Sequence, residues 1–479
     1  MSLKKQTLNS AVWTFIDSFL VKGLSFAAGL VLARLLGPSE FGLIGMISVF
    51  IAIGTSLVDS GLSSSLIRTK HTDNTDYSTV FFTNLGMSLL IYVLLFVSAP
   101  YIADFYEQPI LIGLIRLYCV GFIISAFSAV QLAILIKGMQ FKRITHFNIP
   151  STIIGVGVGV GLGYLGYGVW SIVWMYLVTQ ACNSILFWSF SAWKPSLLIS
   201  KEKLKYHYNF GYKLMLSGLL DQVFNNIYNV VIGKFFSAQS LGYYERAKTF
   251  NSYPSLMLSG VIGKVTYPML AKIQDDSVRV AQVYRNILQV TFFVIAPVML
   301  GAAAVAKPLF LLVLGEAWLP AVPFFQILSI SFMLYPIHAF NINVLKVYGR
   351  SDLFLKLEIY KKIVVSISII IAFQFGIYAL VWSSVFTSLV ALVINTHYSS
   401  QMISYTLKAQ LLDMLPVFVI TVIVFVVMQF GVQFLDLQPL IVQIFIPLLI
   451  GAVLYVGIHY MFKTKAIMYA LTFIKNRNL

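Results

Sequence analysis

Residues 415–434 read LPVFVITVIVFVVMQFGVQF, twenty consecutive positions without Asp, Glu, Lys or Arg. In a helix, about 20 apolar residues are enough to cross the hydrocarbon core of a bilayer. In water, a run of this length would expose more apolar surface than a soluble core can cover. The stretch therefore predicts a transmembrane helix.

The rest of the 479-residue chain consists of similar runs joined by short connections. Charged residues make up only 10% of the sequence, against about 25% in soluble domains. The predicted fold is an all-α integral membrane protein without an extramembrane domain. We predict fourteen transmembrane helices, at residues 11–36, 41–68, 78–103, 110–136, 145–165, 167–191, 206–236, 244–270, 283–306, 322–345, 356–376, 378–400, 410–434 and 438–462.

The positions of Lys and Arg orient these helices, because cytoplasmic loops retain an excess of positive charge during insertion. With the N-terminus placed inside, most of the 33 Lys and Arg residues fall on the cytoplasmic side. Both termini are then predicted to be cytoplasmic. The net charge of +16 follows from this topology, so it does not indicate nucleic-acid binding. Five basic residues fall on the outer side: Arg34, Lys234, Arg246, Lys248 and Lys307.

Two stretches of the chain nearly repeat one another: residues 33–42 read ARLLGPSEFG and residues 233–242 read GKFFSAQSLG. Six predicted helices separate the copies, an even number, so both copies cross the membrane in the same direction. This arrangement is typical of parallel repeats related by an axis along the membrane normal. We predict two six-helix lobes, residues 1–200 and 201–405, followed by residues 406–479 with the last two helices and a basic tail.

Several ionisable residues lie within the predicted helices. Placing a charged side chain in the hydrocarbon costs roughly 2.5–3.5 kcal/mol on insertion scales, so such a residue usually faces water or a partner. They lie on the first, second, seventh and eighth helices, which occupy equivalent places in the two lobes. We predict a polar cavity between the lobes, lined by these four helices. The predicted substrate-binding residues are Lys22, Lys213, Lys264, Arg34 and Lys234, and the cavity carboxylates, which could also carry protons or sodium ions, are Asp17, Asp59 and Asp221.

A plainer interpretation of each charge remains open. A long side chain near the membrane surface can extend its charged end into water, and a carboxylate can form a local ion pair. This alternative is strongest for Lys213 and Lys264, which are predicted to lie near the inner mouth of the cavity.

Glycines at 155, 157, 159, 161 and 163 resemble a phosphate-binding loop only superficially, because such a loop requires a preceding strand. On a helix, Gly155, Gly159 and Gly163 share one face and predict close helix packing. The two cysteines and six histidines have no metal-ligand spacing. We find no catalytic constellation, so we predict no enzyme activity, no metal and no bound cofactor.

The stretch from Gly29 to Gly42, GLVLARLLGPSEFG, resembles the opening of the bacterial Wzx-like polysaccharide transporters. Residues 59–62 (DSGL) and 241–247 (LGYYERA) extend the resemblance, which is strongest to the colanic acid and teichuronic acid exporter branch. It implies the fold of the multidrug/oligosaccharidyl-lipid/polysaccharide exporter superfamily and alternating access. It also implies residence in the bacterial inner membrane. No residue role is carried over from the family, and the cavity residues above rest on depth and repeat position.

The function implied by the resemblance is flipping of an undecaprenyl-diphosphate-linked oligosaccharide from the cytoplasmic to the outer leaflet. The oligosaccharide would be a repeat unit of an exopolysaccharide, teichuronic acid or O-antigen. The expected partners are this lipid-linked glycan, membrane lipids, and glycosyltransferases or a polysaccharide polymerase. Two alternatives stay open: a multidrug or cation antiporter on the same fold, and a membrane glycan polymerase, which the short outer connections disfavour.

Overall fold

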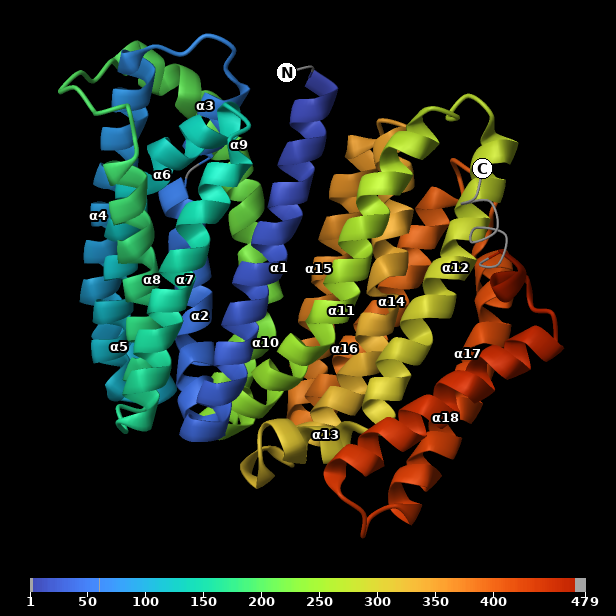
Figure 1. Ribbon diagram of the computed structural model, residues 1–479. Helices are drawn as coiled ribbons and strands as arrows, with labels where there is room; N and C mark the ends of the chain where they lie inside the picture. The colour runs from blue at the N-terminus through green and yellow to red at the C-terminus, as the bar shows by residue number, and fades with distance from the viewer. Residues whose placement is uncertain (1–2, 60, 470–479) are drawn as a thin grey trace. The chain divides into compact units, whose positions relative to one another are not determined.

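The computed structural model describes residues 3–59 and 61–469, apart from the side chains of residues 3–8, 11, 261, 262, 264, 265 and 351. Within this part the chain is helical and contains no strand (Figure 1). The helices are α1 (Leu3–Leu36), α2 (Pro38–Asp59), α3 (Leu62–Arg68), α4 (Asn74–Tyr106), α5 (Ile110–Tyr118), α6 (Val120–Lys137), α7 (Phe141–Tyr164), α8 (Trp170–Ser189), α9 (Lys201–Asn225), α10 (Ile227–Phe235), α11 (Ala238–Ala271), α12 (Ser277–Ala304), α13 (Ala306–Val313), α14 (Ala321–Val347), α15 (Ser351–Ala372), α16 (Ile377–Ser399), α17 (Leu407–Phe434) and α18 (Leu440–Met461), with 3₁₀ turns η1 (Glu316–Trp318) and η2 (Phe373–Phe375).

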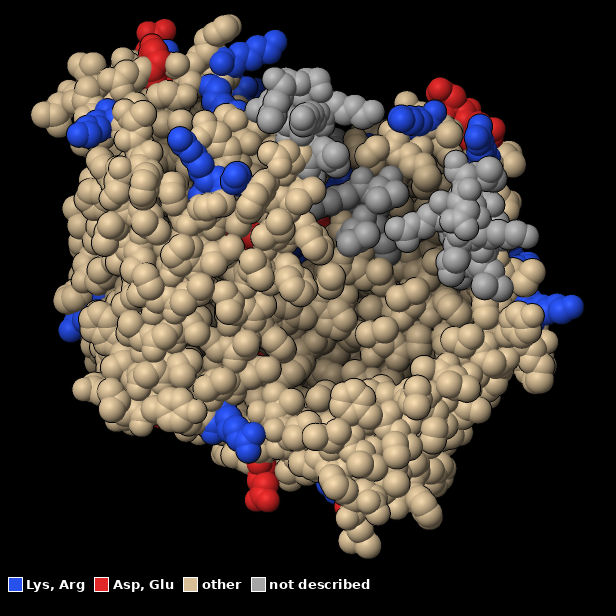
Figure 2. All heavy atoms as spheres, viewed as in Figure 1, with Lys and Arg blue, Asp and Glu red and all other residues tan. Residues whose placement is uncertain are grey.

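Each of the fourteen predicted spans coincides with one of these helices or with consecutive helices. Among the described residues, eleven helical segments are long and apolar enough to cross a membrane. The other three predicted spans correspond to α9–α10, α11 and α15, where Lys, Arg, Asp and Glu are frequent. On the face drawn in Figure 2, charged side chains gather near the helix ends and leave a broad uncharged surface between them.

Three predicted spans, at 41–68, 110–136 and 206–236, are each divided between two α-helices. The span at 41–68 ends as α2 and restarts as α3 after Gly61, whose φ of +66° lies in the left-handed region that favours glycine. A Cβ on Gly61 would lie 2.7 Å from the backbone oxygen of Gly211 in α9. The span at 110–136 is divided at Cys119, between α5 and α6, and the span at 206–236 is divided at Asn226, between α9 and α10. Both of these residues have a negative φ, unlike Gly61.

The described chain divides into two compact units, Met1–Gly242 and Tyr243–Leu479. In the first unit, α9 packs against α2, α3 and α4, although more than 90 residues separate it from them along the chain. In the second unit, α12, α14 and α17 enclose a core that includes Tyr284, Phe292 and Phe340. These units are defined by contacts in space, whereas the predicted lobes at 1–200 and 201–405 are defined by the sequence repeat. The lobes therefore stay a prediction.

The glycine face predicted on α7 is confirmed. A Cβ on Gly155 would collide with Thr179 Oγ1 of α8, and one on Gly159 would lie 2.5 Å from Met175 Cβ of the same helix. Gly163 is closest to Leu32 of α1, whereas Gly157 on the opposite face has no atom within 4 Å of a built Cβ. The small residues let α7 and α8 lie side by side (Figure 1).

This packing predicts unequal effects for two equal substitutions. Gly155→Ala should destabilise the folded protein by about 1–3 kcal/mol, because the added methyl group overpacks the α7–α8 contact. Gly157→Ala is the matched control and should be neutral. The measurement is the unfolding temperature of each purified variant in detergent. Equal unfolding temperatures for the two variants would contradict the packing described here.

The two copies of the sequence repeat contact each other reciprocally. A Cβ on Gly42 would collide with the backbone carbonyl of Ala238, and a Cβ on Gly242 would collide with that of Pro38. In the aligned repeats Gly42 matches Gly242, and Pro38 matches Ala238. The contact of Gly42 with Ala238 and the contact of Gly242 with Pro38 are therefore equivalent contacts, exchanged between the two copies. A two-fold relation between two segments produces such a reciprocal pair.

Candidate functional site

The predicted cavity residues of the first unit lie on α1, α2, α9 and α10. Lys22 and Asp17 are on α1, Asp59 ends α2, and Lys213 and Asp221 are on α9. Arg34 lies in the last turn of α1. Lys234 lies in the last turn of α10. The eighth predicted residue, Lys264, belongs to α11, and its side chain is outside the part that the structure describes.

The two charges on α1 have different surroundings. The Asp17 carboxylate accepts a hydrogen bond of 3.0 Å from Asn148 Nδ2 of α7. The exposed Lys22 makes no hydrogen bond or ion pair within the described part of the chain. An ammonium group in an apolar helix is costly without a wet cavity or an anionic partner. The roles predicted for Lys22 and Asp17 stay predictions.

The structure brings the helices of Asp59 and of Lys213 together. Gly61 of the α2–α3 turn lies against Gly211 of α9, and a Cβ on Gly218 would lie 3.2 Å from Ser56 Oγ of α2. Asp59 and Lys213 are both exposed at this pair of helices. Since α9 is too polar to count among the eleven apolar spans, water or a polar ligand is the natural neighbour of its exposed face.

Lys234 has a partner within this chain. Its Nζ lies 3.0 Å from Glu107 Oε1, at the αL residue that ends α4, and 5.3 Å from the centre of the Phe105 ring. The ion pair accounts for the charge of Lys234 without a substrate. Arg34 is exposed, and its place at the C-terminal end of α1 is favourable for a cation in the helix dipole.

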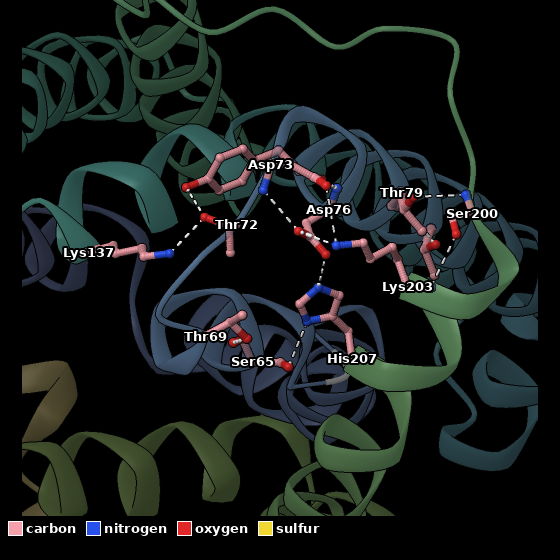
Figure 3. Close-up of polar contacts among 12 residues, drawn as sticks. Ser65, Thr69, Thr72, Asp73, Asp76, Thr79, Lys137, Ser200, Lys203 and His207 are labelled. Carbon is pink, nitrogen blue, oxygen red and sulfur yellow. Dashed lines mark hydrogen bonds and ion pairs between the residues drawn. The ribbon is translucent and has the colours of Figure 1, made fainter.

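A buried polar network, which sequence reasoning missed, holds the first turns of α9 to α3 and α4 (Figure 3). Asp76 Oδ1 lies 3.2 Å from His207 Nε2, and Asp76 Oδ2 lies 3.0 Å from Lys203 Nζ. The other nitrogen of His207, Nδ1, lies 2.8 Å from Ser65 Oγ. Ser65 and His207 are 0% exposed and Asp76 is 2% exposed. We call these four residues the Asp76 network.

Local sequence explains why the carboxylate is held so firmly. Asp73 is the N-cap of α4 and accepts a hydrogen bond of 2.8 Å from the Asp76 N–H, while Asp76 Oδ2 accepts one of 2.9 Å from the Asp73 N–H. This reciprocal pair is a capping box. Because a carboxylate only accepts, His207 Nε2 carries the proton and, in the neutral ring, Nδ1 accepts from the Ser65 hydroxyl. The hydrogen bond to Asp76 also raises the pKa of Lys203, which stays charged at neutral pH.

A serine, a histidine and an aspartate in hydrogen-bond sequence resemble a hydrolase triad, but their burial excludes that role. A nucleophilic hydroxyl must be reached by substrate, and Ser65 is completely covered. The network instead provides hydrogen-bond partners for polar side chains of α3, α4 and α9 where these three helices meet. The capping box was the one sequence signal available, since His207 follows Asp76 by 131 residues.

The segment between α8 and α9 is fastened to the same end of α4. Trp193 Nε1 donates to Asn74 Oδ1 at 2.7 Å, the Ser196 N–H donates to Ser78 Oγ at 3.1 Å, and Ser200 N–H donates to Thr79 Oγ1 at 3.1 Å. With the Asp76 network these bonds fix where α9 begins. They therefore set the position of the exposed Lys213 and Asp221 further along the helix.

Within the described residues no group of three or more His, Cys, Asp and Glu side chains could hold a metal ion.

Comparison of the sequence with models of known protein families identifies the family of this chain. A family model described as "Polysaccharide biosynthesis protein" matches residues 31–323, more than half of the chain. The chain belongs to the polysaccharide biosynthesis protein family. The resemblance predicted from residues 29–42, 59–62 and 241–247 is thereby confirmed.

Named relatives of this chain come from several bacteria. It is 26% identical to the teichuronic acid biosynthesis protein TuaB of Bacillus subtilis, over 88% of each chain. It is 25% identical to the lipopolysaccharide biosynthesis protein WzxC of Escherichia coli, over 78% of this chain and 76% of that one. It is 26% identical to the succinoglycan biosynthesis transport protein ExoT of Rhizobium meliloti, over 68% of this chain and 66% of the relative.

Solved structures share the fold of this chain at lower sequence identity. The lipid II flippase MurJ in an inward closed conformation superposes with a TM-score of 0.72 at 15% identity, covering 96% of this chain and all of that one. An inward-facing multidrug transporter of the MATE family superposes with a TM-score of 0.61 at 17% identity, covering 82% of this chain and 98% of the other. The predicted all-helical membrane transporter fold is confirmed, and the division into two six-helix lobes stays a prediction.

Proposed function

We propose that the protein flips a polyprenyl-diphosphate-linked oligosaccharide, a repeat unit of a bacterial polysaccharide, from the cytoplasmic to the outer leaflet of the inner membrane. The observation that carries the proposal is the family match over residues 31–323. The relatives' names support it, because they tie teichuronic acid, lipopolysaccharide and succinoglycan formation to proteins of this kind. The exposed cations Lys22 and Lys213 on the helices of this chain supply the chemistry.

The substrate joins a long apolar tail to an anionic diphosphate and a hydrophilic glycan. Lys22 and Lys213 are exposed, and neither has an ion-pair partner within the described residues. Ammonium groups are suited to bind phosphate oxygens by charge-assisted hydrogen bonds. We assign Lys22 and Lys213 to the diphosphate and Asp59 and Asp221 to the walls of the polar pathway. Arg34 and Lys264 complete the proposed cation set, whereas Lys234 would have to leave Glu107 to join it.

The carboxylates have a second proposed role in energy coupling. A proton or a sodium ion bound at Asp17, Asp59 or Asp221 would cancel a negative charge in the pathway and favour entry of the diphosphate. Alternating access then requires two arrangements of the pathway, open to one side at a time. Glycosyltransferases that build the glycan would supply the substrate, and a polymerase outside the membrane would consume it. The proposal keeps both termini in the cytoplasm.

Deleting the gene in its own host tests the proposal in the cell. The lipid-linked repeat unit should accumulate in the inner membrane while the mature polysaccharide disappears from the cell surface. Expression of the chain from a plasmid should restore both. A deletion strain that retains normal surface polysaccharide and accumulates no lipid-linked precursor would contradict the proposal.

Lys22→Ala tests the assignment of the diphosphate-binding cation. A charge-assisted hydrogen bond contributes about 1.5–3 kcal/mol, so export should fall by about tenfold or more while the protein still inserts and folds. Lys70→Ala is a control, because Lys70 is an exposed residue of the α3–α4 turn outside the proposed pathway. The measurement is surface polysaccharide per molecule of membrane-inserted protein. Normal export by the Lys22→Ala protein would remove Lys22 from the site.

A further inference from the structure

A cavity of about 410 Å³ lies between the first turns of α1 and the turn that joins α6 to α7. Its walls are fastened together, because Ser10 Oγ donates to the Met139 carbonyl oxygen at 3.2 Å and Thr145 Oγ1 donates to that of Trp13 at 3.3 Å. The lining includes Ser10, Trp13, Met139, Gln140, Lys142 and Arg143. None of the proposed transport residues contributes to it.

The lining is strongly biased in charge. Lys142 and Arg143 are both exposed at the cavity, and no Asp or Glu is among the lining residues. The cavity also faces the beginning of α7, where Gln140 at the N-cap provides no side-chain cap. The positive end of the helix dipole favours an anion at this position. Two cations and a helix N-terminus at one open cavity therefore favour an anionic group.

The aromatic side of the cavity indicates where that anion comes from. The Trp13 ring lies 5.6 Å from Lys142 Nζ and 5.4 Å from the centre of the His146 ring. Tryptophan is enriched at the level of lipid headgroups, where one side of the ring is apolar and the other is wet. The basic turn at Lys142 and Arg143 belongs to the end of the helices that the charge distribution assigns to the cytoplasm. Basic pockets between transmembrane helices at this surface bind anionic lipid headgroups.

We propose that this cavity binds the phosphate headgroup of an anionic phospholipid of the inner leaflet. Lys142 and Arg143 hold the phosphate oxygens, the first turn of α7 contributes backbone N–H groups, and Trp13 packs beside the glycerol and acyl region. The lipid joins α1 to α7 one helical turn before Asp17, which already accepts its hydrogen bond from Asn148 of α7. The bound lipid thus stabilises the inner end of α1, the helix that carries Lys22.

Lipid binding to the purified full-length protein tests the proposal without any transport measurement. Native mass spectrometry would compare phosphatidylglycerol and cardiolipin with phosphatidylcholine at equal concentrations. The wild type should retain the two anionic lipids. The double variant Lys142→Gln/Arg143→Gln should bind them about 30-fold more weakly, because each basic residue near the surface contributes about 1 kcal/mol.

The matched control is Lys201→Gln/Lys205→Gln, which removes two exposed charges from the first turns of α9 and should leave lipid binding unchanged. A graded series at one wall position adds a second check: Gln140→Glu should weaken binding and Gln140→Lys should strengthen it. Equal losses in the two double variants would overturn the proposal, because total charge and not the cavity would then bind the lipid.

Two further arms separate the possible sources of the phosphate. Inorganic phosphate at millimolar concentration should leave the anionic phospholipid bound, and displacement by it would overturn the lipid assignment in favour of a free-phosphate site. A polyprenyl-diphosphate that binds through Lys142 and Arg143 while phosphatidylglycerol does not would overturn it in favour of a substrate-entry site.

Discussion

Replacing Gly42 by alanine is expected to remove folded, active protein from the membrane. A Cβ at this position would overlap the backbone carbonyl of Ala238, and no rotation of a side chain can relieve a clash with backbone. The start of α2 would have to move away from the start of α11. We expect a loss of about 3 kcal/mol, at the upper end for overpacked sites, and Gly242→Ala should have the same effect through Pro38.

Gly86→Ala provides the matched control, because a Cβ on Gly86 of α4 would have no atom within 4 Å. The measurement is the fraction of monodisperse protein after extraction, followed by the unfolding temperature. Because Gly42 and Gly242 belong to one crossing, the double variant should lose less than the sum of the single losses. A Gly42→Ala protein as stable as Gly86→Ala would show that the reciprocal contact is absent.

Asp76→Ala is expected to have the second large effect. Removing the carboxylate leaves the buried His207 Nε2 without its acceptor, leaves Lys203 paired with Asp73 alone at 3.3 Å, and breaks half of the capping box. An unsatisfied buried donor costs about 1–3 kcal/mol, and the weakened cap adds about 1 kcal/mol. The unfolding temperature of the purified variant should fall accordingly. Export should also fall, because the Asp76 network positions α9 and this helix carries the proposed transport residues Lys213 and Asp221.

Asp73→Ala is the control within the same capping box. The side chain of Asp73 is 59% exposed, so its loss should cost about 1 kcal/mol, as for other helix caps. His207→Gln keeps a hydrogen-bonding side chain and should lie between the two aspartate variants. If Asp76→Ala and Asp73→Ala were equally stable, the buried carboxylate would not be the residue that holds α9.

The positions of the helices were predictable because the bilayer imposes a simple rule on sequence. Runs of about 20 apolar residues need helices, and all fourteen predicted spans are helical. The Gly155, Gly159 and Gly163 face was predictable for the same reason, since 3.6-residue periodicity decides which glycines share a side. The break at Gly61 was missed because it depends on the close approach of Gly211, a contact that local sequence does not encode.

The candidate site was predictable in part. An isolated charge in an apolar run is visible in sequence, and Lys22 and Asp59 were selected on that ground. Lys234 fits the same pattern, but its pairing with Glu107 depends on tertiary structure. The Asp76 network was missed because its members come from separate helices and two of them, Ser65 and His207, have no local pattern that distinguishes them from ordinary packing residues.

Leaflet transfer in proteoliposomes tests the central claim most directly. The purified chain would be reconstituted with a labelled polyprenyl-diphosphate-linked oligosaccharide, and the fraction of label accessible to an external enzyme would be followed over time. The account predicts rapid transfer with the wild type and slow transfer with Lys22→Ala at equal reconstitution. No acceleration of any such lipid-linked glycan by the wild type, with or without a proton or sodium gradient, would contradict it.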